Sequence, residues 1–420
     1  MRRVRMLVLT LLGAALLTAA CFHAVAAADR MPPEGPAALA QEPGPQVAAP
    51  SGSCYDGEQD SGAKYRICLP AGDWSDLIVY AHGYVASTEP VTIPEDQMSL
   101  PGFPYTVDQI ATDIIGSAFA TTSYYTNGLA VLPAISDLLD LVNIFTTTHG
   151  VPERIYLAGV SEGGIITALS VEQYPDVYDG GLAMCGPYGD FQDQINYWGD
   201  FRLVFDYFFP DLMPGEPLTI PAGLGEEWES GFFTETIEPV IADPASEISV
   251  TELMTVVGAS PYAYAPPTST ASIEQLLWYN VFATEDGIVK LGGQPFNNKD
   301  PWRPYSGSSD DDRLNESVER ISASQAALDE IAANYQTTGE ISVPLVTLHT
   351  TGDEVVPYWH ATQYRDMIIA AGRGSLHKQL EVDRHGHCAF GFEDILNAFT
   401  ALVDMVERRY VFLPLIVRAP

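Results

Sequence analysis

The chain has 420 residues, of which 46% are apolar and 18% charged, so it holds enough apolar material for a folded core. With 55 acidic and 20 basic residues, its formal net charge at pH 7 is −35. Phosphate recognition needs clustered Lys and Arg, so this balance excludes nucleic acids and anionic membrane surfaces as expected partners. The acidic surface favours solubility; adaptation to salt and recruitment of a cationic partner are the alternatives.

The N-terminus has the three parts of a secretory signal peptide. Arginines within the first five residues precede an apolar run over 6–20, and small residues at 24–26 offer a cleavage site. We therefore expect residues 1–28 to be removed and the protein to be secreted. The alternative is a lipoprotein signal, in which Cys21 would carry a lipid and hold the protein at the cell surface. Residues 29–52 are rich in Pro and Ala and read as a linker.

From residue 53 onward, apolar runs alternate with longer helical patterns, which is typical of a parallel sheet covered by helices. Buried strands are expected at 76–81, 117–123, 154–158, 181–185, 344–349 and 378–382, and helices at 128–148, 164–174 and 391–408. The catalytic core is therefore predicted over 53–185 and 343–409, as one α/β domain.

Residues 186–342 interrupt this alternation and are predicted to form a mainly helical lid. The aromatic residues in its first part are expected to pack mostly into the lid's own core, with some lining an apolar pocket. The apolar tail over 410–420 is too short to span a bilayer. An edge strand or a docked extension is expected there, with a surface-attachment segment as the alternative.

The cysteine pattern of an exported chain indicates disulfides. Without Cys21, four cysteines remain: Cys54, Cys68, Cys185 and Cys388. Four cysteines allow three pairings. The first two flank a turn-rich stretch between short strand-like segments, which favours a hairpin bridge between them. That choice leaves Cys185 to pair with Cys388.

A nucleophile motif follows the third predicted strand and opens onto a helix. Gly159–Gly163 reads G-V-S-E-G and matches the pattern G-x-S-x-G. A sharp turn from strand to helix raises the serine hydroxyl above the sheet, and small residues on both sides of it permit that turn. Ser161 is therefore the candidate nucleophile.

A serine nucleophile needs a base and a group that orients the base, and both follow in the order Ser, Asp, His. Asp353 comes after a glycine at the end of the penultimate strand, which favours it over Glu354, expected to be a solvated neighbour. His387 comes after a glycine beyond the last strand, which favours it over His385.

These motifs resemble the α/β-hydrolase superfamily over residues 53–409. The resemblance implies an α/β-hydrolase fold with Ser161 as nucleophile, His387 as general base and Asp353 as the orienting acid. It also implies an oxyanion hole built from two backbone N–H groups. Glu162 supplies one by its position after the serine. Tyr84, in a His-Gly-Tyr element after the first clear strand, is the candidate for the other.

A narrower resemblance is to tannases and feruloyl esterases, which carry cysteines beside both the catalytic serine and the histidine and join them in a disulfide. Cys388 follows His387 as in that family, but Val160 stands before Ser161, so that bridge cannot form. Cys185 can take the place of the missing partner, which would pin the histidine loop to the sheet. Because this chain lacks that bridge, the resemblance does not imply specificity for aromatic esters.

No cofactor or metal is expected, because the acidic run at 310–312 lacks the spacing of a calcium cage. The sequence predicts a secreted serine hydrolase that cleaves small or polymeric carboxylic esters through an acyl-enzyme. A serine aminopeptidase of the same fold is the first alternative. A non-catalytic surface binding protein on a hydrolase scaffold is the second.

Overall fold

The computed structural model describes residues 52–100, 102–260 and 269–416, and the structural account is confined to them. The predicted signal peptide, Cys21 and all of the predicted linker except Gly52 lie outside the described residues. The expectations for these segments therefore remain predictions.

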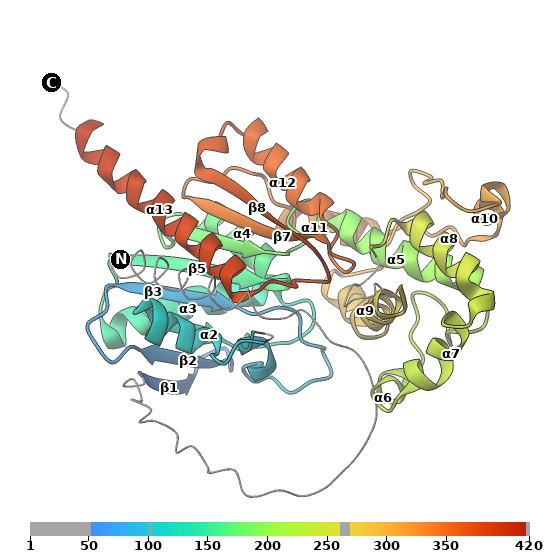
Figure 1. Ribbon diagram of the computed structural model, residues 1–420, viewed down its shortest axis with the longest axis horizontal. Helices are drawn as coiled ribbons and strands as arrows, with labels where there is room; N and C mark the ends of the chain where they lie inside the picture. Colours follow the sequence, from blue (N-terminus) through green and yellow to red (C-terminus); the bar gives the residue numbers. More distant parts are fainter. Residues whose placement is uncertain (1–51, 101, 261–268, 417–420) are drawn as a thin grey trace, which may run out of the picture.

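An eight-stranded sheet forms the centre of the molecule, in the order β1-β2-β4-β3-β5-β6-β7-β8 (Figure 1). The strands are β1 (Ser53–Glu58), β2 (Lys64–Leu69), β3 (Asp76–Ala81), β4 (Ala118–Thr122), β5 (Arg154–Val160), β6 (Gly180–Met184), β7 (Leu345–Gly352) and β8 (His377–His385). β2 pairs antiparallel with β1 and with β4, and all other neighbours are parallel. This strand order, with a nucleophile turn after β5, is the α/β-hydrolase fold, so the predicted fold class is confirmed.

Helices cover both faces of the sheet, so its central strands are apolar on both sides. In β3, Leu77 and Val79 pack with α3 (Val131–His149) and α4 (Glu162–Gln173). The alternating residues of β3 pack on the opposite face with α13 (Phe392–Ile416). Within the described part of the chain, α3 alone is long and apolar enough to cross a membrane by length and composition, and it packs into this core.

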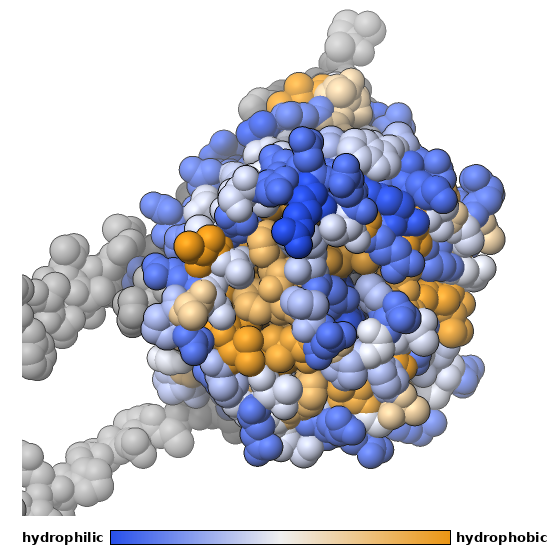
Figure 2. Space-filling model, turned by 90° about the vertical axis from the view of Figure 1, so that its right-hand side faces the viewer, coloured by the Kyte–Doolittle hydropathy of each residue, from blue (hydrophilic) through white to orange (hydrophobic). Residues whose placement is uncertain are grey.

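The segment between β6 and β7, called the insertion below, lies beside the sheet (Figure 1). It holds α5 (Phe191–Phe208), α6 (Leu224–Glu229), η3 (Phe233–Ile237), α7 (Glu238–Ile241), η4 (Pro244–Ser246), α8 (Glu247–Val257), α9 (Ser269–Lys290), α10 (Asp311–Ser317) and α11 (Gln325–Asn334). Aromatic side chains of α5, such as Phe201 and Phe205, are buried in a hydrophobic cluster within the insertion. Figure 2 shows this side of the molecule, on which apolar residues are exposed inside a ring of hydrophilic ones.

Short helices complete the core: η1 (Glu95–Met98), α2 (Val107–Gln109) and η2 (Ile110–Ile115) follow β3, and α12 (Trp359–Ala370) and η5 (Gly374–Leu376) follow β7. The C-terminal tail differs from the prediction, because α13 continues to Ile416 instead of ending near residue 408. The expected edge strand is therefore wrong for residues 410–416. Neither Gly nor Pro occurs between Phe392 and Leu413, so the helix meets no stop signal there.

Candidate active site

Ser161 occupies the sharp turn between β5 and α4. Its backbone has φ 57° and ψ −121°, a region that non-glycine residues seldom adopt. The turn needs glycine on both sides. A Cβ on Gly159 would lie 2.0 Å from the Gly163 carbonyl oxygen, and one on Gly163 would lie 2.0 Å from the Ala81 carbonyl oxygen. The G-x-S-x-G spacing is thus a packing requirement of this turn.

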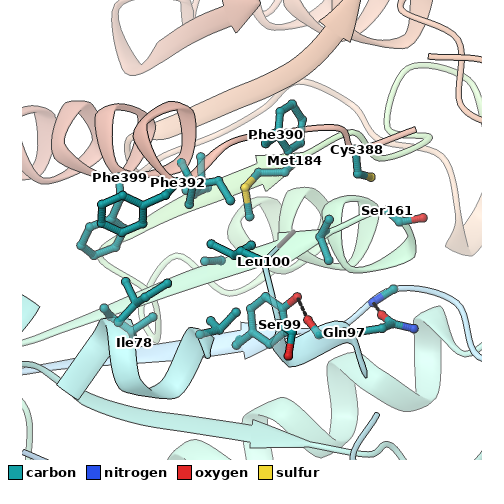
Figure 3. Close-up of a pocket in the computed structure, with 18 of the residues that line it drawn as sticks. Ile78, Gln97, Ser99, Leu100, Ser161, Met184, Cys388, Phe390, Phe392 and Phe399 are labelled. Atoms are coloured by element: carbon teal, nitrogen blue, oxygen red, sulfur yellow. Dashed lines mark hydrogen bonds between the residues drawn. The ribbon is translucent and has the colours of Figure 1, made fainter. Parts of the chain in front are cut away.

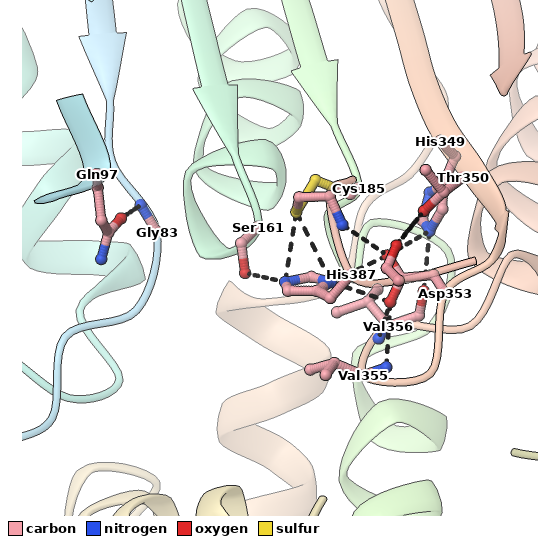
Figure 4. The surroundings of a disulfide bond; sticks show 12 residues. Gly83, Gln97, Ser161, Cys185, His349, Thr350, Asp353, Val355, Val356 and His387 are labelled. Atoms are coloured by element: carbon pink, nitrogen blue, oxygen red, sulfur yellow. Dashed lines mark hydrogen bonds and ion pairs between the residues drawn. A yellow bond between two sulfur atoms is a disulfide. The ribbon is translucent and has the colours of Figure 1, made fainter. Parts of the chain in front are cut away.

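The structure brings the three predicted residues together in one hydrogen-bonded chain (Figure 4). His387 Nε2 lies 2.9 Å from Ser161 Oγ, and His387 Nδ1 lies 2.9 Å from each carboxylate oxygen of Asp353. Asp353 follows β7 and is buried, and its Oδ1 accepts the N–H groups of Val355 at 3.1 Å and Val356 at 2.8 Å. These bonds hold the carboxylate in place beneath the imidazole.

The imidazole of His387 is mostly buried but stands among negative charges. Burial alone would lower the pKa of His387, but the adjacent Asp353 carboxylate and then Glu354 raise it above its usual value. A base with this raised pKa accepts a proton from a serine hydroxyl more readily than an isolated imidazole would. His385, the alternative histidine, is exposed at the end of β8.

The expectation that Glu354 is a solvated neighbour is wrong. Its side chain is fully buried, and its Oε1 accepts the N–H of His387 at 3.2 Å. Its Oε2 has no hydrogen-bond partner among the described residues. Burial and then the Asp353 charge raise the pKa of Glu354 to about 7. The loop after β7 turns inward beneath the histidine loop, and a motif match alone does not reveal that turn.

The two predicted oxyanion donors flank the serine. Glu162 is the first residue of α4, and the first N–H groups of a helix have no acceptor within it. Tyr84 lies in the loop after β3, and none of the hydrogen bonds found in the described chain uses its N–H. The preceding Gly83 packs so closely that a Cβ there would lie 3.1 Å from Ser161 Cβ.

Gln97 of η1 holds this loop, and no sequence pattern marks it as part of the site. Its Oε1 accepts the N–H of Gly83 at 2.7 Å, and its Nε2 donates to the carbonyl of Tyr84 at 3.0 Å. One side-chain amide therefore fixes the two peptide groups on either side of the candidate oxyanion donor.

The side chain of Glu162 turns away from the predicted oxyanion position. It is buried, and its Oε1 accepts the N–H of Ala130 at 2.8 Å. Burial raises the pKa of the Glu162 carboxyl to about 8, and the Ala130 hydrogen bond offsets this only in part. The carboxyl therefore holds its proton more tightly than an exposed glutamate does.

A tyrosine from the insertion also reaches the nucleophile. Tyr279 of α9 is close enough to interact with the Ser161 side chain: burial raises the pKa of Tyr279, and Ser161 offsets part of that rise. Its ring stacks on Trp198 with the ring centroids 4.5 Å apart, and its centroid lies 5.7 Å from that of Tyr84. Tyr279 lies outside the aromatic run in the first part of the insertion, so the sequence does not predict it as a site residue, and only the packing of α9 places it at the site.

Both predicted disulfides are present. Cys54 and Cys68 face each other across β1 and β2, and Cys185 joins Cys388 with a Cα–Cα distance of 5.5 Å. Cys388 Sγ lies 3.4 Å from His387 Nε2, so this second bridge fixes the residue next to the imidazole. Within the described ranges, each group of side chains close enough to hold a metal includes a disulfide-bonded cysteine, which cannot ligate as a thiolate.

Two cavities meet at Tyr84, Ser161 and Tyr279. The larger, of about 320 Å³, lies between the sheet and α13 and is called the core cavity (Figure 3). The smaller, of about 110 Å³, lies between α5 and α9 of the insertion and is called the insertion cavity. The nucleophile therefore has space for a substrate group on each side.

Comparisons with known proteins give distant similarities. No protein-family model matches the chain. An o-phthalyl amidase from Xanthobacter agilis is 24% identical over 326 residues, covering 65% of this chain and 72% of the amidase.

Among solved structures, an esterase from Aspergillus oryzae is 13% identical, with 83% of this chain and 78% of that chain covered and a TM-score of 0.45. An acylaminoacyl peptidase from Pyrococcus horikoshii is 11% identical with a TM-score of 0.39, and the match covers 87% of this chain but only 41% of the peptidase. At these scores the fold assignment rests on the strand order and on the turn at Ser161.

Proposed function

We propose that the protein is a serine hydrolase that cleaves carboxylic esters through an acyl-enzyme. The observation that carries the proposal is the chain Ser161–His387–Asp353, with 2.9 Å between hydrogen-bonded atoms at both of its joints. That arrangement couples a nucleophile, a general base and a group that fixes the tautomer of the base.

In the first half-reaction, His387 Nε2 takes the Ser161 proton while Oγ attacks the ester carbonyl. The N–H groups of Glu162 and Tyr84 hold the oxyanion of the tetrahedral intermediate. The C–O bond to the alcohol then breaks, and His387 returns the proton to the leaving oxygen. In the second half-reaction His387 activates a water that attacks the acyl-enzyme, the acid departs, and Ser161 regains its proton.

The similarity to an amidase supports amide or peptide cleavage as the second candidate. An aminopeptidase would need an ionised acid to bind the ammonium group of a substrate. Among the described residues, Glu162 carries the only carboxyl group that lines the insertion cavity. Burial raises the pKa of its carboxyl, and its Oε1 already accepts the N–H of Ala130, so Glu162 is a poor partner for an ammonium group. This favours an ester, or an amide without a free amino group, over a peptide with a free N-terminus.

We further propose that the enzyme acts outside the cytoplasm, on small or polymeric esters. Two disulfides support this location, since such bridges persist in oxidising compartments. N-terminal sequencing and mass measurement of the exported protein would distinguish cleavage near residue 28 from lipid attachment at Cys21.

The catalytic proposal is tested with Ser161→Ala. Wild-type protein should hydrolyse p-nitrophenyl butyrate and be labelled by a fluorophosphonate at Ser161, and the variant should lose both properties while unfolding at the same temperature. Full retention of turnover in the variant would refute the proposal. Aminoacyl p-nitroanilides and N-acylated p-nitroanilides assayed beside the ester separate the candidates, because preference for a free α-amino group would favour the peptidase.

A further inference from the structure

The core cavity indicates the substrate class, an inference that rests on the proposed ester hydrolysis. Its floor is the face of the sheet that packs against α13, with Ile78 on β3, Ala158 on β5 and Leu182 on β6. Its far wall is α13, through Phe392 and Phe399. Its mouth is at Ser161.

The cavity runs along the strands, away from the carboxyl ends where the nucleophile lies. Ala158 of β5 stands three residues before Ser161, a depth of about 10 Å at the rise of a strand. Ile78 lies two residues deeper, beside Tyr156. On the opposite wall, the step from Phe392 to Phe399 spans about 10 Å at the rise of a helix. Both walls therefore give a channel long enough for an extended chain of at least about eight carbons.

Away from the mouth at Ser161, the described residues of the walls carry no charge, and their polar side chains are those of Tyr80, Gln97 and the exposed Ser99. No Asp, Glu, Lys or Arg is among the described residues that line the core cavity. The Gln97 amide is held by Gly83 and Tyr84, and the Tyr80 hydroxyl donates to the Gln97 carbonyl at 3.2 Å. A polar substrate group would lose its water there without gaining a partner, whereas a hydrocarbon would gain from burial.

We infer that the core cavity binds an unbranched hydrocarbon chain of at least about eight carbons joined to the scissile ester, while the smaller insertion cavity takes the other side of the ester. The chain can belong to the acyl part or to the alcohol part. Both would present the same chemistry to this channel, and the substrate series below distinguish them. Small side chains at mid-depth, Ala158 and Ala111, leave the channel open.

The test measures kcat/KM in two series: p-nitrophenyl esters from acetate to hexadecanoate, and acetates of unbranched alcohols from ethanol to hexadecanol. In the series whose varied chain enters the core cavity, kcat/KM should rise by up to about fourfold per methylene. It should fall once the chain is longer than the channel. In Ala158→Phe, the ring fills the channel, so the ratio of the eight-carbon to the four-carbon substrate should fall at least tenfold in that same series. Ala111→Leu is the second variant if Ala158→Phe does not fold.

The matched control is Gly287→Leu, which fills the insertion cavity instead; a Cβ at Gly287 has no neighbour within 4 Å. It should leave the preferred chain length of that series in place. The inference is overturned if neither series favours chains longer than four carbons, or if Gly287→Leu shortens the preferred chain and Ala158→Phe does not.

A binding measurement separates this inference from the catalytic proposal. Calorimetry with 1-octanol and 1-butanol on Ser161→Ala protein should show tighter binding of octanol, and adding Ala158→Phe should abolish the difference. Equal binding of the two alcohols would overturn the inference even if esters are hydrolysed. Preferential octanol binding with no ester hydrolysis by the wild type would leave the channel standing and refute the proposed function.

Discussion

Replacing Gln97 with leucine tests whether the loop carrying Tyr84 must be held for catalysis. Gln97→Leu removes the two hydrogen bonds, of 2.7 and 3.0 Å, that fix the peptide groups around Tyr84. A neutral hydrogen bond contributes about 0.5–1.5 kcal/mol net, so the loop loses about 1–3 kcal/mol of restraint. An oxyanion donor contributes about 2.7–4 kcal/mol, which sets the upper limit of the effect.

We therefore expect kcat to fall about 5- to 100-fold. KM should change less than about threefold, because the oxyanion forms only during the reaction and is absent from the enzyme–substrate complex. The assay is p-nitrophenyl butyrate hydrolysis at active-site concentrations fixed by fluorophosphonate titration. Glu95→Gln is the matched control, because Glu95 lies in the same short helix but forms an exposed ion pair with Arg66. A kcat within twofold of wild type in folded Gln97→Leu protein would refute the role of this restraint.

Three further predictions concern the neighbours of the imidazole and the nucleophile. Tyr279→Phe removes a hydroxyl from the side chain that lines both cavities together with Ser161 and should lower kcat about tenfold with little change in unfolding temperature, whereas unchanged kcat would assign the ring a packing role only. Glu354→Gln removes a charge that raises the pKa of His387. Because His387 acts as a base only when unprotonated, the acid limb of the profile of kcat/KM against pH should move to lower pH. A move to higher pH would contradict this reasoning. Replacing Cys185 and Cys388 together with alanine should lower the free energy of unfolding by about 2–5 kcal/mol and reduce kcat, and full kcat in the folded variant would show that the imidazole keeps its position without the bridge.

The parts of the site that sequence predicted are those with local requirements. The turn at Ser161 needs glycines two residues before and after it, so it leaves a readable pattern. Asp353 and His387 follow the ends of neighbouring parallel strands, and those ends meet at the same edge of the sheet. The pairing of Cys185 with Cys388 followed by elimination once the β1–β2 hairpin claimed the other two cysteines.

The missed features depend on segments that approach each other only in three dimensions. Gln97 acts across a loop, in a short helix with no periodic pattern to mark it. Tyr279 lies near Ser161 only because of how α9 packs, and the sequence alone does not show that packing. Glu354 was expected in solvent because charged residues beside a motif are usually exposed, but here the loop after β7 is covered by α5.

That cover makes the insertion part of the catalytic framework as well as a wall of the substrate site. Three side chains of α5 donate hydrogen bonds to the loop that carries Asp353: Gln194 Nε2 at 2.9 Å and Trp198 Nε1 at 3.0 Å to the Val355 carbonyl, and the Tyr197 hydroxyl at 2.6 Å to the Glu354 carbonyl. The same loop donates the Val355 and Val356 N–H groups to the Asp353 carboxylate. Any displacement of α5 would therefore reach the imidazole through one continuous set of bonds. Trp198 of α5 both donates to this loop and stacks on Tyr279 at the mouth of the insertion cavity. The same helix therefore helps to position the base and lines the cavity that receives the substrate.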